Sequence, residues 1–291
     1  MHINDLKIFI AIADYGTFTQ AAIATNTVQS NVSARIKVLE DYFGDKLLKR
    51  STRSAELTPA GTSFLKLARE ILGKLEDFKE SLADTTVIKG HLKIGCLQTT
   101  AALRAPAILQ QFTESYPEVE FKLKTGTTAS LIKEVLTYKL DGAFVSGELN
   151  NGELEGQTIV YEELGVVYAK NFGSLDDLIK ANKTIKLIVF SKGCTYRHIL
   201  TELLATYPEK TIRFIEMDSL EAIIQAVEQG LGITLLPTAL IEKQYAFRNV
   251  KTESPADKLE KVPTLFIKRK DFPMNNAYKE FFSTIQKGYA E

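Results

Sequence analysis

Hydrophobic residues recur at helical spacing in the first part of the chain, up to about Thr86. This pattern predicts helices over residues 4–14 and 18–24 and a third that starts at about Val28. The polar sequence Thr25-Asn26-Thr27 forms a turn between the second and third helices. Two helices joined by such a turn are typical of a helix-turn-helix, although a helical hairpin with a solvated outer face has the same pattern.

From about Gly90 onward, short apolar strands alternate with helices. Strands are expected at 92–97, 119–124, 142–146, 165–169, 185–190, 212–217, 233–236 and 263–268, and helices at 102–115, 130–139, 196–205, 220–229 and 276–287. This alternation predicts mostly parallel sheets covered by helices. The chain is therefore expected to be α+β and multidomain, with a helical N-terminal part and an α/β C-terminal part.

Composition narrows the class of protein. The 291 residues are 45% hydrophobic, which suits about two packed domains. The charges balance, with 36 Lys plus Arg and 36 Asp plus Glu, so any contact with nucleic acid must come from a local basic patch. Two distant cysteines and the lack of a signal-peptide pattern predict a cytoplasmic protein. The apolar runs are too short to cross a bilayer, so no membrane partner is expected.

The third predicted helix has one apolar and one polar face. Val32, Ile36, Leu39 and Phe43 form a stripe that would pack on the first two helices. Polar side chains near a helix N-terminus can contact base edges in a major groove. The residues expected to contact bases are Gln29, Ser30, Asn31, Ser33 and Arg35.

A basic segment follows this helix. Lys46, Lys49, Arg50 and Arg53 lie within eight residues that include no acidic residue. They belong to a stretch, 47–57, that is predicted to form a two-stranded ribbon, or wing. We expect Lys37, Lys49, Arg50 and Arg53 to contact phosphates and to make binding depend on salt.

Five blocks of sequence resemble the N-terminal signature of LysR-type transcriptional regulators. They are Phe18-Thr19-Gln20-Ala21-Ala22, Gln29-Ser30-Asn31-Val32-Ser33, Ile36-Lys37-Val38-Leu39-Glu40, Leu47-Leu48-Lys49-Arg50 and Leu57-Thr58-Pro59-Ala60-Gly61. Two positions depart from the family pattern: Ser30, where many members have proline, and Ala34, where many have a charged residue. The base preference of relatives therefore does not transfer to this chain.

The resemblance implies an architecture and a function. A winged helix-turn-helix would occupy residues 1–58, a linker and dimerisation helix 59–89, and an effector-binding domain 90–291. That last domain would resemble type II periplasmic binding proteins, with lobe I at about 90–162 and 269–291 and lobe II at about 163–268. The implied partners are double-stranded operator DNA with inverted-repeat half-sites, a small effector, a second copy or three further copies of the chain, and RNA polymerase.

The helix that starts at Pro59 carries a coiled-coil pattern. Apolar residues at alternating intervals of four and three are typical of a seam that packs on a partner helix. The seam consists of Phe64, Ala68, Ile71, Leu75, Phe78 and Leu82. The alternative is that this stripe packs within its own chain.

Four strand-to-helix junctions of the C-terminal part are rich in hydroxyl groups, and in doubly wound sheets small ligands bind at such junctions. A carboxylate or another anion is the expected ligand. The predicted effector residues are Thr99, Thr100, Thr128, Cys194, Thr195 and Arg197, of which the resemblance places the four threonines in the pocket between the lobes. For each threonine alone, ordinary helix capping is the alternative.

Two rival functions depend on cysteine. Cys194 with His198 four residues later could form a nucleophile and base, although nothing in the sequence orients the histidine. Cys96 and Cys194 could instead face each other as a redox sensor, or could be ordinary buried thiols. The histidines and cysteines do not have the paired spacing of a zinc site. The sequence therefore predicts a regulator that is not an enzyme and holds no metal or cofactor.

Overall fold

The computed structural model describes residues 1–50, 55–81, 87–254, 261–272 and 275–288. The chain divides into two compact units, and the main boundary lies between the helix α4 (Pro59–Ser81) and the strand β3 (Gly90–Cys96). No helix within the described ranges is both long enough and apolar enough to cross a membrane.

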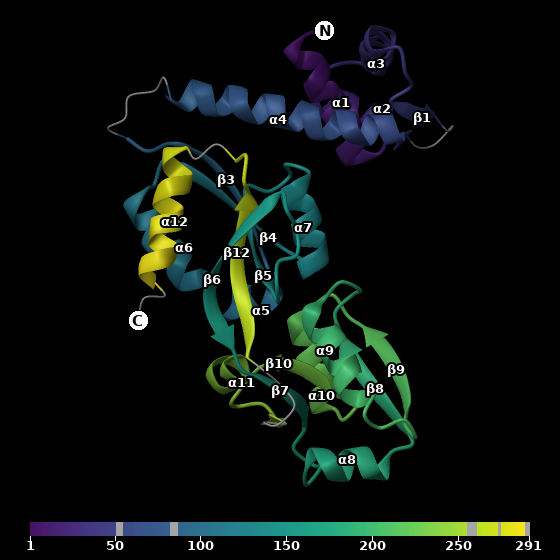
Figure 1. Cartoon of the computed structure of the whole chain (residues 1–291), viewed down its shortest axis with the longest axis vertical. Coiled ribbons are helices and arrows are strands. Elements are labelled where there is room, and N and C mark those ends of the chain that lie inside the picture. The colour runs from purple at the N-terminus through teal and green to yellow at the C-terminus, as the bar shows by residue number, and fades with distance from the viewer. Residues whose placement is uncertain (51–54, 82–86, 255–260, 273–274, 289–291) are drawn as a thin grey trace. The chain divides into compact units, whose positions relative to one another are not determined.

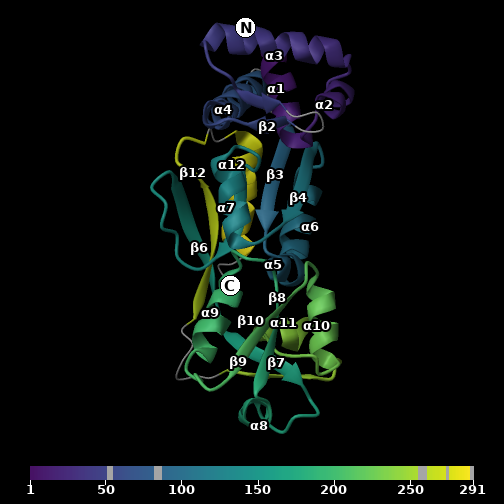
Figure 2. The ribbon, with the colours of Figure 1, turned by 90° about the vertical axis from the view of Figure 1, so that its right-hand side faces the viewer.

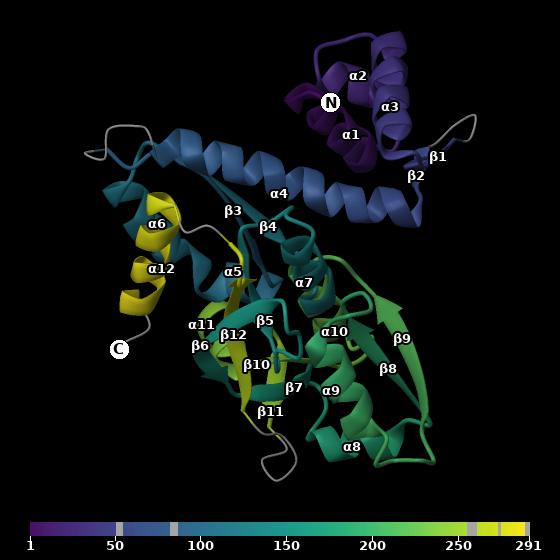
Figure 3. The same ribbon diagram turned by 45° about the horizontal axis from the view of Figure 1, so that its top comes forward.

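The first unit is a winged helix-turn-helix. Its elements are α1 (Ile3–Tyr15), α2 (Phe18–Ala24), α3 (Gln29–Phe43), the strands β1 (Leu48–Arg50) and β2 (Ala55–Leu57), and α4. Figure 3 shows α1, α2 and α3 grouped together, with β1 and β2 beside the start of α4. Phe9, Val32, Ile36 and Leu39 are fully buried in the core. Phe43 was expected in the same stripe, but it lies at the helix end and is 42% exposed.

The seam predicted on helix α4 consists of two parts, which lie in different surroundings. Phe64 and Ala68 are buried in the core of their own unit, and Ile71 packs against that core. Leu75 and Phe78, one to two turns further on, are 41% and 63% exposed. Leu82 lies outside the described residues. The described part of the seam therefore packs within its own unit at Phe64, Ala68 and Ile71 and is exposed at Leu75 and Phe78.

Lobe I of the second unit contains one five-stranded sheet in the order β4-β3-β5-β12-β6. Besides β3, its strands are β4 (Val119–Thr125), β5 (Gly142–Ser146), β6 (Leu154–Glu162) and β12 (Val262–Arg269). The assignment of 262–268 to lobe II was wrong, because β12 pairs with both β5 and β6. Both pairings are antiparallel, so this sheet is less parallel than the strand–helix rhythm predicted.

Helices cover both faces of this sheet. Figure 1 shows α6 (Ala105–Ser115) and α12 (Asn276–Gly288) on one face and α7 (Thr128–Leu136) on the other. The core between α6, α12 and the sheet is aromatic, with Phe112, Phe266, Tyr278 and Phe281. The helix predicted over 102–115 is in fact two helices. The first, α5 (Gln98–Leu103), ends at Arg104, because Pro106 suits only the first turn of a new helix.

Lobe II has two small sheets, β10-β7-β11 and β8-β9, which an isolated bridge between Leu187 and Ile233 connects. The strands are β7 (Leu164–Ala169), β8 (Thr184–Val189), β9 (Thr211–Glu216), β10 (Thr234–Pro237) and β11 (Val250–Glu253). The helices are α8 (Leu175–Ala181), α9 (Thr195–Leu204), α10 (Leu220–Glu228) and α11 (Thr238–Gln244). Figure 2 shows the strands between α9 and α10. Strand β7 is antiparallel to both neighbours, whereas β8 and β9 are parallel.

Candidate functional sites

The N-terminal turn of α3 presents polar groups. Asn26 adopts a left-handed conformation, with φ of 51°, in the turn before α3. Val28 is the N-cap residue and offers no side-chain acceptor, so the first backbone amides of α3 are not capped by it. Gln29, Ser30 and Asn31 are exposed there, and the Asn31 amide donates to the Thr27 hydroxyl over 2.8 Å. The N-terminal turn of α3 can therefore bind an anionic group or a hydrogen-bonding group of a partner.

The remaining predicted residues of α3 lie in different surroundings. Lys37 is exposed and Ser33 is half-buried. Arg35 points to α1, where its guanidinium forms a two-pronged ion pair with Asp5. Its side chain is 28% exposed, whereas that of Asp5 is completely buried. The structure thus gives Arg35 an internal partner, in contrast to the outward position that the sequence pattern predicted.

The wing is attached to α3 through Glu40, which is buried at the C-terminal end of that helix. The Glu40 carboxylate accepts hydrogen bonds from the backbone amides of Leu47 (3.1 Å) and Leu48 (3.3 Å) and from Lys46 Nζ (2.7 Å). Lys49 is exposed on β1. Arg50 ends that strand, and Arg53 lies outside the described residues. One buried carboxylate therefore joins the polar helix to the basic wing.

The start of α4 packs directly on the wing backbone. The Thr58 amide donates to the Leu47 carbonyl over 3.1 Å, and the Thr58 hydroxyl caps α4 by accepting from the Gly61 amide over 2.9 Å. A Cβ at Gly61 would lie 1.9 Å from the Leu47 carbonyl oxygen, so only glycine fits this contact. The wing is thus fixed by α3 on one side and by α4 on the other.

A cavity of about 330 Å³ lies between the two lobes of the second unit. The four predicted strand-to-helix junctions, residues 98–101, 126–128, 192–197 and 218–219, all contribute to it, and most of its lining side chains carry hydroxyl groups. The lining residues are Leu97, Gln98, Thr99, Thr125, Gly126, Thr127, Thr128, Ser130, Ser146, Phe190, Ser191, Lys192, Cys194, Thr195, Tyr196 and Asp218. Lys192 is the basic residue among them and Asp218 the acidic one.

Four of the six predicted effector residues line this cavity: Thr99, Thr128, Cys194 and Thr195. Thr100 is buried but is not part of the lining. Arg197 is directed to the far side of α9, where Nη1 donates to Glu216 over 2.7 Å and the guanidinium covers the Phe214 ring at 4.6 Å. The sequence placed Arg197 at the right junction but could not show which way its side chain points.

Helices α7 and α9 begin close to each other on opposite sides of the cavity. The Thr195 hydroxyl lies 3.2 Å from that of Thr128 and donates to the Ser146 carbonyl over 2.8 Å. The Ala129 amide donates to the Gly193 carbonyl over 3.2 Å. A Cβ at Gly193, where φ is +94°, would lie 2.6 Å from that of Ala129, so glycine permits this close approach.

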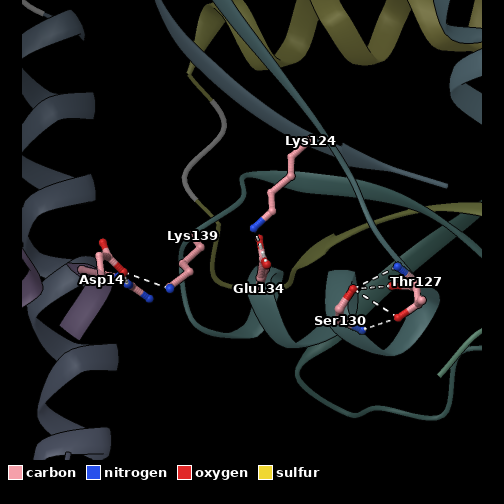
Figure 4. A network of polar contacts seen from close by, with 7 residues as sticks. Asp14, Lys124, Thr127, Ser130, Glu134 and Lys139 are labelled. Atoms are coloured by element: carbon pink, nitrogen blue, oxygen red, sulfur yellow. Dashed lines mark hydrogen bonds and ion pairs between the residues drawn. The ribbon is translucent and has the colours of Figure 1, made fainter. Parts of the chain in front are cut away.

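Other polar groups near α7 bind each other. Figure 4 shows the Ser130 hydroxyl accepting from the Thr127 amide over 3.0 Å and Lys124 paired with Glu134 over 2.6 Å. Across the cavity, the Gln98 side chain donates to the Asp218 carbonyl and accepts from the Leu220 amide over 2.8 Å. These groups pair with one another and stabilise the local structure, whereas other hydroxyls face the cavity.

Two buried hydroxyls of the cavity, those of Thr99 and Ser146, lie beside the Tyr196 phenol and form no well-aligned hydrogen bond within the described structure. Thr99 is 3% exposed and Ser146 is 2% exposed. Burial raises the pKa of the Tyr196 phenol, so it is a neutral donor. Incompletely bonded buried hydroxyls are costly, and these two line the cavity, whereas those of Thr264 and Tyr278 do not. Ser146 was missed because it ends a strand that no predicted helix follows.

Both cysteines are free thiols. Burial raises the pKa of Cys96 to about 12. Burial also raises the pKa of Cys194, although the amides of Tyr196 and Arg197 oppose this effect. Since the thiolate is the reactive form, neither cysteine is activated at neutral pH. His198 is exposed and pairs with Glu202 on its own helix. Within the described residues, no group of three or more His, Cys, Asp or Glu side chains could hold a metal ion.

Comparison with known families gives two matches that together span most of the chain. Residues 3–62 match the model of the bacterial regulatory helix-turn-helix protein of the lysR family. Residues 86–290 match the LysR substrate binding domain.

Individual proteins agree with these matches. The chain is 37% identical to the uncharacterized HTH-type transcriptional regulator YusT of Bacillus subtilis, over 98% of this chain and 95% of the relative. It is 36% identical to the HTH-type transcriptional regulator CzcR of Bacillus cereus, over 98% and 97%. Among solved structures, full-length OxyR from Pseudomonas aeruginosa has a TM-score of 0.71 at 20% identity, covering 99% of this chain and 94% of that one. CbnR, a LysR family transcriptional regulator, has a TM-score of 0.68 at 22% identity, with both chains fully covered.

Proposed function

Because the chain belongs to the family of LysR-type transcriptional regulators, we propose that it reads an operator of two related half-sites and responds to a small anionic effector. In this proposal Gln29, Ser30, Asn31 and Ser33 contact bases. Lys37, Lys49, Arg50 and Arg53 contact phosphates. The effector lies in the cavity between lobe I and lobe II. A solved complex of the similar protein CbnR with its target DNA supports the DNA-binding part.

The observation that carries the effector proposal is the convergence of α7 and α9 on one cavity. Each helix N-terminus has a partial positive charge, and the hydroxyls of Thr128 and Thr195 lie only 3.2 Å apart. Lys192 adds a full positive charge to the lining. An anion in the cavity, beside the contact between the two helix N-termini, would be stabilised by both dipoles, and the buried hydroxyls of Thr99 and Ser146 would donate to it.

Thermal unfolding with a panel of small carboxylates tests this proposal. Each carboxylate is compared with its neutral amide at the same concentration. We expect at least one carboxylate to raise the melting temperature of the protein while its amide does not, because ligand binding stabilises the folded state by mass action. Thr195→Val should abolish this rise. Equal shifts with amides, or shifts that persist in Thr195→Val, would contradict an anion held at this place.

The DNA-binding part is tested by fluorescence anisotropy. Duplexes that the protein selects from a random pool are compared with scrambled duplexes of the same composition at two salt concentrations. We expect tighter binding to the selected duplex and weaker binding at high salt, since phosphate contacts release counterions. Identical affinities for both duplexes would contradict sequence-specific recognition.

A dimer is proposed through the C-terminal half of α4. Leu75 and Phe78 are exposed there, and a symmetric dimer would place two reading helices on related half-sites. Phe78→Glu should lower the molecular mass measured by sedimentation equilibrium, whereas the exposed control Lys79→Glu should not. Unchanged mass in Phe78→Glu would contradict this interface. Contact with RNA polymerase and a cytoplasmic location complete the proposal.

Neither rival function gains support from the site. The raised pKa values of Cys96 and Cys194 disfavour both a thiol-based sensor and a Cys194 nucleophile. We propose that the chain acts as a regulator and not as an enzyme. Measurement of DNA affinity before and after mild oxidation, together with a thiol count, checks the redox alternative, which predicts that both change together.

A further inference from the structure

The Asp5 carboxylate lies at the junction between α1 and α3 and has no exposed surface. It accepts a hydrogen bond from the His2 backbone amide over 2.6 Å, which caps the first turn of α1. It also accepts from Nε and Nη2 of Arg35, the second over 2.7 Å. One buried carboxylate therefore joins the start of α1 to the middle of α3.

The Arg35 guanidinium is held in a fixed direction by this pair. A planar guanidinium bound to both carboxylate oxygens is restricted in angle as well as in distance. Val32, Ile36 and Leu39 pack α3 on the neighbouring helices through apolar contacts, which are not directional. Glu40 holds the C-terminal end of α3 to the wing, and Gln29 at the N-terminal end accepts from Thr19 of α2, so Arg35 is the residue that ties the middle of α3 to α1. The ion pair is thus suited to set how far α3 is rotated about its own axis.

We propose that Asp5 and Arg35 act together as positioning residues for DNA specificity. In this role the pair fixes the rotation of α3, so that Gln29, Asn31 and Ser33 face the same base edges in every encounter. Arg35 then serves specificity through Asp5 and not through a base contact of its own. This inference rests on the proposed DNA-binding function, and its failure can be separated from the failure of that function.

The alternative is that Arg35 itself contacts DNA, as its place on α3 would allow. The two ideas differ in what Asp5 does. If Arg35 reads bases directly, the loss of Asp5 frees the guanidinium and specificity persists. If the pair positions α3, the loss of either partner has the same effect, and the loss of both has no further effect.

The experiment is a double-mutant cycle in DNA binding by the full chain. The probe is a duplex that the wild-type protein selects from a random pool, and a scrambled duplex of equal length and composition measures nonspecific binding. The variants are Asp5→Asn, Arg35→Gln and the double variant. We expect each variant to reduce the ratio of specific to nonspecific affinity by about tenfold, the effect of roughly one mismatched base pair. The double variant should show the same ratio, and the salt dependence on scrambled DNA should be unchanged in Arg35→Gln.

Two further variants separate positioning from loss of the fold. Asp5→Glu keeps the charge but moves the carboxylate by one methylene, so it should also reduce the ratio while the melting temperature stays close to that of the wild type. Lys37→Ala, on the same helix, should weaken both duplexes equally and leave the ratio unchanged. These two variants keep the test valid if Asp5→Asn does not fold.

The outcomes are distinct. A ratio that falls in Arg35→Gln but not in Asp5→Asn or Asp5→Glu would overturn the proposal in favour of direct readout by Arg35. Additive losses in the double variant, or no loss in any variant of the pair, would also overturn it. If the wild-type protein selects no sequence from the pool, the proposed sequence-specific function fails, and with it the premise of the pair.

Discussion

The winged helix-turn-helix unit and the cavity between the two lobes both contain buried polar side chains, but these side chains differ in how far they are hydrogen-bonded. In the first unit, the buried carboxylates of Asp5 and Glu40 each accept several hydrogen bonds from backbone amides and basic side chains. In the cavity, the buried hydroxyls of Thr99 and Ser146 have the Tyr196 phenol beside them but form no well-aligned hydrogen bond within the described structure. Satisfied buried groups fix a structure, whereas unsatisfied ones cost stability until a ligand meets them.

This difference separates two tasks within one chain. If α3 reads DNA as proposed, it must hold a constant geometry against the wing, and directional contacts to buried carboxylates provide that rigidity. If the cavity binds the proposed effector, incompletely bonded hydroxyls in its wall gain hydrogen bonds when the ligand enters, and this gain favours binding. Sites of the second kind reduce the stability of the folded protein in favour of function.

The largest expected effect is that of Glu40→Ala. This change leaves the buried amides of Leu47 and Leu48 without their acceptor, and each such loss costs about 1–3 kcal/mol. The unfolding free energy of the first unit should therefore fall by roughly 2–6 kcal/mol in urea titrations. Glu56→Ala, at an exposed position of β2, is the control and should change it by less than about 0.5 kcal/mol. Similar results for both variants would show that Glu40 does not hold the wing.

Thr99→Val should have the opposite sign. It removes a buried hydroxyl that forms no well-aligned hydrogen bond and keeps the shape of the side chain, so the free energy of unfolding should rise by about 1 kcal/mol. The same variant should lose the stabilisation that the effector gives. Thr125→Val, at an exposed part of the cavity wall, should change neither quantity by much. A less stable Thr99→Val protein would mean that this hydroxyl is already paired, and the contrast between the two sites would not hold.

A low pH should destabilise the first unit because it protonates the Asp5 carboxylate. Burial alone would raise the pKa of this carboxyl, but the hydrogen bonds from Arg35 and His2 bring it below its usual value. A carboxyl with a lowered pKa in the folded state adds stability above its unfolded pKa of about 3.9, and this stability is lost as the pH falls toward the folded value. Urea unfolding between neutral pH and pH values below about 4 should show this loss in the wild type. The loss should be smaller in Asp5→Asn, and equal slopes in both proteins would contradict it.

The smallest expected effect is that of Lys49→Ala. The exposed Lys49 side chain lies on the wing, so its loss should remove one phosphate contact. The slope of log affinity against log salt should then become shallower by about 0.9, with sequence preference retained. Lys46→Ala is the matched control, because Lys46 is paired with Glu40. A change of preference in Lys49→Ala would mean that the wing reads bases.

Elements with a strong local pattern could be predicted from the sequence. The turn between α2 and α3, the start of α4 at Pro59 and the four hydroxyl-rich junctions follow from neighbouring residues. Strand β6 was missed because it is an edge strand whose exposed and buried positions do not alternate. Strand β11 and helices α8 and α11 were missed because each is too short to show a repeated hydrophobic period.

Two features of the sites could not be predicted from the sequence: which distant strands pair, and in which direction a side chain points. The place of β12 in lobe I depends on pairing with strands more than a hundred residues earlier, which no local pattern encodes. Arg35 and Arg197 both lie on predicted helices, but each points to an acidic partner on another element, Asp5 and Glu216. A basic residue on a polar helix face therefore predicts an ion pair as readily as a ligand contact.

The pairing of β6 with β12 has a consequence for how the effector domain is assembled. Glu162, the last residue of β6, lies opposite Val262, the first residue of β12. Everything between them, which is the whole of lobe II, enters and leaves the first lobe at neighbouring positions of one antiparallel hairpin. Lobe II is thus topologically a domain inserted into a hairpin loop. A short turn that joins Glu162 to Val262 would close the lobe I sheet without it, which makes this pair of residues the natural point for excising or exchanging the second lobe.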